Sequence, residues 1–106
     1  MIPNNEPVTC QDGFRISVQA SSCHYCSPRE DNAESYATVE LGYPSSPQPL
    51  IHSYAEDRNA PTQTVYSQVP VAIVRELLAK HGGIVSGGLP AGVYEDSKGQ
   101  AVLDLD

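Results

Sequence analysis

Residues 70–81 read PVAIVRELLAKH, a segment in which apolar side chains recur at helical spacing. Ile73, Val74, Leu77 and Leu78 fall on one stripe, and charged side chains lie on the opposite side. Pro70 suits the first turn because its missing N–H has no helical partner to lose. Two glycines follow at once and provide a left-handed stop. The segment therefore predicts a helix that covers an apolar surface.

Two alternating segments, residues 14–21 and 36–43, supply the surface that this helix would cover. Strict alternation of apolar and polar residues predicts strands with one buried and one solvated side. In the second strand, Tyr36, Thr38 and Glu40 are expected on the solvated side. The expected buried sides consist of Phe14, Ile16, Val18 and Ala20 in the first strand, and of Ala37, Val39, Leu41 and Tyr43 in the second.

Shorter apolar runs add the remaining candidate strands. These are Val8-Thr9-Cys10, a possible start at Leu50-Ile51 after a proline-rich break, residues 64–69, residues 84–86, and a terminal hairpin over residues 93–105. The predicted fold class is α+β, with an antiparallel sheet, one packed helix at residues 70–81 and many loops. Residues 1–106 are expected to form a single domain with an irregular arm at residues 1–7.

The acidic balance of the chain excludes some classes of partner. Its 106 residues carry a net charge of −7, which repels nucleic-acid phosphates and anionic membrane surfaces. A basic partner is favoured, and proteins that normally hold DNA or RNA are one such class. The alternative is that the charge only keeps a small protein in solution. We expect no direct nucleic-acid binding, no membrane association, and a monomer or homodimer.

Targeting signals and the number of cysteines indicate the cellular compartment of a protein. The start of the chain lacks the basic and apolar regions of a signal peptide, and no apolar stretch is long enough for a membrane span. Three cysteines are an odd number, which does not fit a secreted disulfide framework. These features predict a cytoplasmic protein.

The segment Cys23-His24-Tyr25-Cys26 is the most metal-like feature of the sequence. A zinc site would add Cys10 and one of the histidines His24, His52 and His81, whereas ordinary zinc frameworks pair two such knuckles. Isolated thiols are the favoured interpretation, so no metal and no cofactor are expected. Redox chemistry is disfavoured because no helix is predicted after Cys26. No nucleophile elbow or phosphate-binding loop is present, and we expect no enzymatic activity.

Two polar loops combine acidic and aromatic residues, a composition found at protein interfaces. A solvated charged face is the alternative interpretation. Whether the two loops converge on one face is not readable from the sequence. The candidate interface residues are Tyr25, Arg29, Glu30, Asp31 and Glu34 in the first loop, and Tyr54, Glu56 and Asp57 in the second.

Five motifs carry a family resemblance: SVQA at 17–20, HYCSPR at 24–29, VELGYPS at 39–45, TVY at 64–66 and VPV at 69–71. With these motifs the chain resembles a group of small uncharacterised proteins encoded by bacteriophages and prophages, over about residues 12–83. None of the motifs carries an active-site residue.

The resemblance implies an inhibitor of bacterial immunity, similar to anti-CRISPR proteins, that acts in the host bacterial cytoplasm, binds its target stoichiometrically and occludes a nucleic-acid site. Two alternatives remain open. One is a small zinc-stabilised or regulatory adaptor domain. The other is a protein that sequesters a small-molecule immune signal, which for an anionic signal requires Arg15, Arg29, Arg58 and Arg75 to converge.

Overall fold

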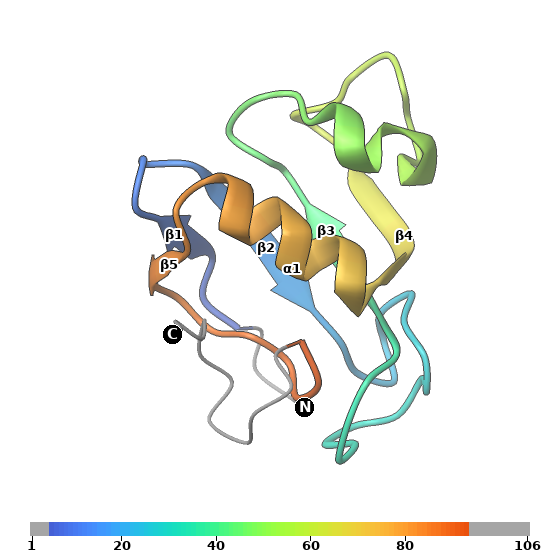
Figure 1. Cartoon of the computed structure of the whole chain (residues 1–106). Coiled ribbons are helices and arrows are strands. Elements are labelled where there is room, and N and C mark those ends of the chain that lie inside the picture. The colour runs from blue at the N-terminus through green and yellow to red at the C-terminus, as the bar shows by residue number, and fades with distance from the viewer. Residues whose placement is uncertain (1–4, 94–106) are drawn as a thin grey trace.

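A five-stranded antiparallel sheet forms the frame of the protein in the computed structural model, which describes residues 5–93 (Figure 1). The strands lie side by side in the order β4-β3-β2-β1-β5, and every neighbouring pair is antiparallel. This arrangement and the single α-helix confirm the predicted α+β class. The strands are β1 (Val8–Cys10), β2 (Arg15–Gln19), β3 (Thr38–Gly42), β4 (Val65–Pro70) and β5 (Ile84–Ser86).

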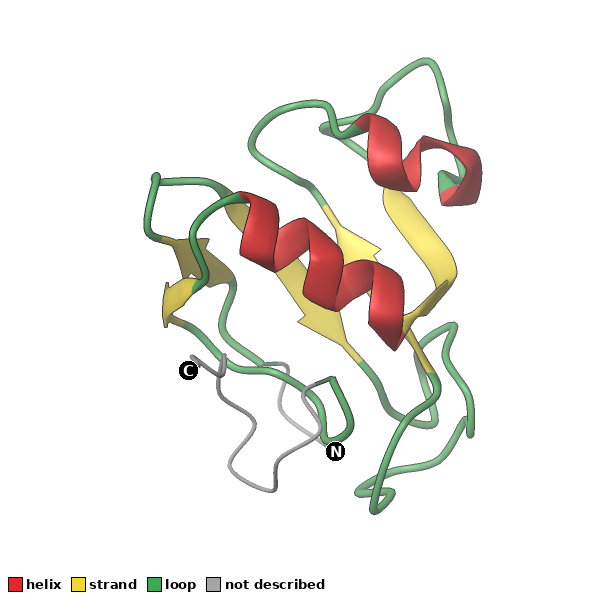
Figure 2. Ribbon diagram, viewed as in Figure 1, coloured by secondary structure: helices red, strands yellow, loops and turns green. Residues whose placement is uncertain are grey.

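The predicted helix is confirmed as α1 (Val71–Lys80), and it lies across one face of the sheet (Figure 2). Val74, Leu77 and Leu78 are fully buried against that face, whereas Ile73 is only half-buried. Burial of each such side chain contributes about 1.5–3 kcal/mol relative to exposure. The helix ends as expected, with the N–H of Gly83 donating to the Leu78 carbonyl over 2.9 Å. The sheet side of this core is made of Val8, Ile16, Val18, Val39, Leu41, Tyr66 and Val69.

The opposite face of the sheet carries small and polar side chains. Ser17 pairs with Gly42 and Gln19 pairs with Glu40 across β2 and β3, so these four residues share that face. Among the described residues no helix covers it (Figure 2). The core is therefore one-sided.

The prediction of a strand start at Leu50-Ile51 was wrong. These residues belong to a 3-10 helix, η1 (Pro49–Tyr54), which begins at a proline. Pro49 has no N–H and a fixed φ, which suits the first turn of a helix better than a place in a sheet. Ile51 is fully buried, so the apolar pair joins the core from a helical turn.

The assignment of two tyrosines to the sides of the second strand was also wrong. Tyr36 is only 4% exposed, whereas Tyr43 is 58% exposed. Strand β3 spans only Thr38–Gly42, so both tyrosines lie beyond its ends. Tyr43 has a φ of +53°, which turns its side chain away from the buried side. The two-residue period applies only where the backbone stays extended.

The described residues include part of the predicted arm and the first residue of the predicted terminal hairpin. Residues 5–7 are irregular, as predicted for the arm, and residues 1–4 lie outside the described part. The predicted hairpin at 93–105 also lies outside it, except for the fully buried Val93. Within residues 5–93, no helix is both long and apolar enough to cross a membrane.

His81 joins three separate segments just after α1. Its ring stacks on Phe14, with the centroids 4.1 Å apart and the planes 13° from parallel. Its Nδ1 lies 2.7 Å from Oδ2 of Asp12, and its Nε2 lies 2.9 Å from Oε1 of Gln48. The amide nitrogen of Gln48 donates to Ser46, so its oxygen faces the ring. This contact ties the helix end to the β1–β2 turn and to the segment before η1.

Replacing Gly87 by alanine should destabilise the fold more than the same change at Gly13. Both glycines have positive φ, +106° and +93° respectively, so each variant carries similar backbone strain. A Cβ at Gly87 would lie 2.5 Å from Cα of Val8, whereas nothing lies within 4 Å of one at Gly13. We expect the free energy of unfolding in urea to fall by at least ~1 kcal/mol more for Gly87→Ala. Equal losses would contradict the close approach of these two segments.

The contact between Asp12 and His81 should make stability depend on acid pH. The hydrogen bond to His81, with a second from the Phe14 N–H, lowers the pKa of Asp12 below its ordinary value of 3.8. A carboxyl whose pKa is lower in the folded state stabilises the fold above its unfolded pKa, and this contribution is lost as pH falls through the folded pKa. In urea titrations, Asp12→Asn should be less stable than wild type at pH 6, with a difference that shrinks below about pH 4. A constant difference would contradict this linkage.

Candidate functional site

The five predicted interface residues of the first loop are all exposed in the structure. We define the acidic loop as residues 22–35, which connect β2 to β3 at the lower edge of the molecule in Figure 1. Tyr25 is 47% exposed, and Arg29 is also exposed. The exposed carboxylates of this loop are Glu30, Asp31 and Glu34.

Tyr36 holds the second half of the acidic loop, around Glu30 and Ala33, in place. Its hydroxyl donates to the carbonyl of Glu30 over 2.6 Å and accepts from the N–H of Ala33 over 3.2 Å. The ring beneath is buried in the core, so the hydroxyl reaches the loop from a fixed position. The turn that carries Glu30 and Asp31 is therefore fastened to the core.

Asp31 closes the loop from the other side. Its Oδ1 accepts from the N–H of Ser22 over 2.9 Å, which joins the start of the loop to the turn that carries Glu30 and Asp31. This bond, followed by one from the Ser22 hydroxyl, lowers the pKa of Asp31 from its ordinary value. Asp31 therefore remains negatively charged in neutral solution.

Gln68 anchors the first half of the acidic loop, around Tyr25 and Cys26, to the edge strand β4. It sits at a β-bulge with a φ of +53°, where the pairing between β3 and β4 shifts register. Its N–H donates to the carbonyl of Tyr25 over 3.1 Å, and its side-chain nitrogen donates to the carbonyl of Cys26 over 3.3 Å. Thr38 on β3 donates its hydroxyl to the Gln68 amide oxygen over 2.6 Å. A residue of β4 at the bulge therefore supports the acidic loop through hydrogen bonds.

Tyr25 and Arg29 form a pair on the surface of the loop. The guanidinium carbon of Arg29 lies 5.1 Å from the centre of the Tyr25 ring, within the range of a cation–π contact. An exposed pair of this kind contributes about 0.5–1 kcal/mol and restricts both side chains. The loop therefore presents an aromatic ring, one cation and three carboxylates in a defined arrangement.

The second predicted group of interface residues, Tyr54, Glu56 and Asp57, lies beside the same strand, β4. Glu56 accepts from the Ser67 hydroxyl through its carboxylate, next to the residue that anchors the acidic loop. Asp57 is exposed and accepts from the N–H of Asn59 over 3.0 Å. Tyr54 is half-buried on η1 and packs against the core. Both groups thus contact β4, with η1 and the acidic loop toward opposite ends of that strand (Figure 1).

The cysteines do not gather around a common point in the described residues. Cys10 and Cys26 are buried and Cys23 is exposed, and no three metal-ligating side chains among residues 5–93 form a cluster. Burial, with a smaller contribution from the charge of Asp12, raises the pKa of Cys10 to about 11. Burial also raises the pKa of Cys26, whose Sγ donates to the Ser21 carbonyl over 3.3 Å. Both buried side chains are held as neutral thiols.

The arginines that an anionic signal would need are held apart. Arg75 donates to the carbonyl of Val93 over 2.6 Å, and Arg58 donates to the carbonyl of Ser53 over 3.0 Å. Arg29 packs on Tyr25, and Arg15 begins strand β2. These four side chains therefore do not form a common anion site.

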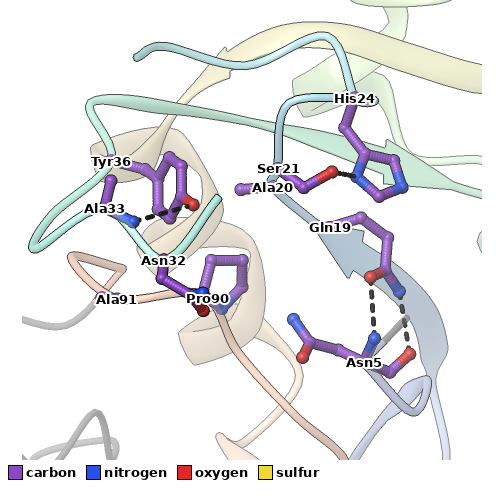
Figure 3. A pocket seen from close by; sticks show the side chains of 10 residues that line it. All are labelled: Asn5, Gln19, Ala20, Ser21, His24, Asn32, Ala33, Tyr36, Pro90 and Ala91. Carbon is purple, nitrogen blue, oxygen red and sulfur yellow. Dashed lines mark hydrogen bonds between the residues drawn. The ribbon is translucent and has the colours of Figure 1, made fainter. Parts of the chain in front are cut away.

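A hollow of about 310 Å³ behind the acidic loop was not predicted from the sequence. Figure 3 shows that its walls come from the arm, the end of β2, the acidic loop and the segment around Pro90. The end of β2 and the acidic loop are continuous, but the arm and the segment around Pro90 are far from them in the sequence, so no local pattern joins all the walls. Ser21, whose hydroxyl lies 2.7 Å from Nδ1 of His24, is one of the few polar residues buried here.

Replacing Tyr36 by phenylalanine should loosen the acidic loop without removing the buried ring. The change leaves the Glu30 carbonyl and the Ala33 N–H without this partner, and we expect a loss of about 1–2 kcal/mol in the free energy of unfolding. The matched control is Tyr43→Phe, because Tyr43 is 58% exposed, and its cost should stay within ~0.5 kcal/mol. Urea unfolding of both variants measures the difference. Equal stabilities would contradict the role of the Tyr36 hydroxyl.

Comparison with known proteins leaves the resemblance to phage-encoded proteins as a prediction from the sequence motifs. No family model, curated protein or solved structure matches the chain. Any partner is therefore inferred from the chemistry of the acidic loop.

Proposed function

We propose that the chain is an acidic, non-enzymatic binding protein that inhibits a bacterial defence complex by stoichiometric association, as anti-CRISPR proteins do. The observation that carries this proposal is the acidic loop, whose shape is fixed by contacts within the protein itself. The partner would be a basic protein or nucleoprotein surface that normally holds nucleic acid. The sequence resemblance to phage-encoded proteins supports this class of partner.

Order in the free protein favours association because less conformational freedom is lost on binding. Immobilising a flexible side chain at an interface costs about 0.5–1.5 kcal/mol, and ordering a loop costs more. In this loop the backbone around Glu30, Ala33 and Tyr25 is already held by Tyr36 and Gln68. A partner can therefore bind the surface with a smaller entropic penalty.

Charge complementarity supports a basic partner. Glu30, Asp31 and Glu34 are exposed within five consecutive positions, and the whole chain carries a net charge of −7. Such a surface attracts Lys and Arg side chains and speeds association, and salt weakens both effects. A protein that occupies those basic side chains prevents them from holding phosphates.

Tyr25 and Arg29 supply the groups that most often anchor an interface. Tyr and Arg are enriched among residues whose truncation weakens binding strongly. Here the ring is 47% exposed and the guanidinium packs on it, so the pair projects as one unit. We expect it to form the centre of the contact, with the carboxylates around it.

The proposal predicts that reversing charges on the acidic loop weakens capture of the partner. The variant Glu30→Lys/Glu34→Lys changes two exposed side chains. Its matched control, Glu6→Lys/Glu76→Lys, makes the same change in net charge at two exposed residues outside the loop. Tagged proteins are incubated with lysates of bacteria that carry intact defence systems, at low and moderate salt, and the captured proteins are identified by mass spectrometry.

We expect wild type and the control to retain a nucleic-acid-binding defence complex that elutes as salt rises. The loop variant should lose at least ~10-fold in affinity for that complex once it is purified. Capture of no such complex by the wild-type protein would refute the proposal. Equal loss in both variants would show that net charge, and not the acidic loop, drives the association.

A further inference from the structure

The hollow behind the acidic loop has the size of a small-ligand site. Its volume of about 310 Å³ lies at the lower end of the range of about 300–1,000 Å³ for such pockets. Small apolar side chains, including Ala20, Ala33 and Pro90, form part of its walls. A compact ligand would contact these walls on more than one side (Figure 3).

Among the described residues, none of those that line the hollow carries a permanent charge. The polar members are Asn5, Gln19, Ser21, His24, Asn32 and Tyr36, without Lys, Arg, Asp or Glu. Placing a phosphate or carboxylate there would desolvate an anion without an opposite charge, which is strongly unfavourable. The chain's net charge of −7 adds to this penalty. The hollow therefore favours an uncharged ligand.

Most polar groups of the hollow already have partners. The side-chain amide of Gln19 accepts from the N–H of Asn5 over 2.9 Å and donates to its carbonyl over 2.8 Å. Tyr36 uses its hydroxyl to hold the acidic loop. The Ser21 hydroxyl accepts from the N–H of Cys23 over 3.0 Å and shares a second hydrogen bond, over 2.7 Å, with Nδ1 of His24. These groups shape the site and are not available to a ligand.

One polar group remains available. Nε2 of His24 points away from the other residues that line the hollow (Figure 3), and the same ring lines a second hollow beside Glu40 and Tyr43. The side-chain amide of Asn32, an exposed residue, has no hydrogen-bond partner in the described part of the chain. Its φ of +56° is one that asparagine adopts more readily than most residues. The site thus offers an adjacent hydrogen-bond donor and acceptor on Asn32.

We propose that this hollow binds a small uncharged heterocycle with an adjacent hydrogen-bond donor and acceptor on one edge, such as a nucleobase. An Asn amide recognises such an edge with two parallel hydrogen bonds, as asparagine does with adenine. Free nucleosides and small heterocyclic amides share this chemistry. This site is independent of the protein partner proposed above, since none of the residues that line the hollow belongs to the proposed protein interface.

The test is a titration of the full chain, followed by amide chemical shifts in NMR spectra. The probes are adenosine, guanosine, cytidine, uridine and nicotinamide, with adenosine monophosphate as the charged comparison. We expect saturable shifts at His24, Asn32, Ala33 and Ala91 with at least one uncharged probe, and no tighter binding of the monophosphate than of adenosine. The absence of saturable shifts with all uncharged probes, or clearly tighter binding of the monophosphate, would overturn the proposal.

Variants separate this site from non-specific binding. Ala91→Phe places a ring in the hollow, and the matched control Ala72→Phe places one on the exposed side of α1. Asn32→Asp keeps a residue that tolerates positive φ but removes the amide donor, which should weaken binding about 10-fold. Urea unfolding confirms that each variant is folded. Unchanged affinity in both Ala91→Phe and Asn32→Asp would refute the site.

Discussion

The packing of Val74, Leu77 and Leu78 against one face of the sheet is the interaction on which the rest of the structure depends. One short helix, helped by the turn of η1, provides the apolar cover, and in the described residues no second helix covers the other face. Long connections cannot be buried in such a core, so their polar backbone groups need other partners. Side chains that reach from the core and the sheet into the loops supply many of these partners.

Three residues illustrate this arrangement. Tyr36 extends its hydroxyl from the core into the acidic loop, Gln68 supports the same loop from a bulge in β4, and His81 joins the helix end to two other segments. Each of these residues makes several hydrogen bonds to other parts of the chain. Each one therefore holds several residues in place. The consequence for function is that an exposed, charged loop can keep a defined shape. Both the proposed protein interface and the proposed ligand site depend on that shape.

Periodicity predicted α1, β2 and β3 in place, with ends that differ by up to two residues, and short apolar runs indicated β1, β4 and β5. It failed where the backbone leaves the extended conformation, as at Tyr36 and Tyr43, and where Pro49 starts a helical turn. The composition of the acidic loop could be read from the sequence, but not its anchoring, because the partner of Tyr25 lies on β4 and that of Glu30 is a tyrosine whose period suggested solvent. The hollow could not be predicted, since stretches near residues 5, 19–36 and 90 form it together.

The central claim is that the acidic loop is ordered before any partner binds, and residue-resolved amide hydrogen exchange of the free protein tests it most directly. The decisive amides are those of Ser22 and Ala33, which donate to side chains, and that of Gln68, which donates to the loop. The structure predicts that all three exchange at least ~10-fold more slowly than in an unfolded chain. Exchange of Ser22 and Ala33 at unfolded rates, while the amides of α1 stay protected, would contradict the account.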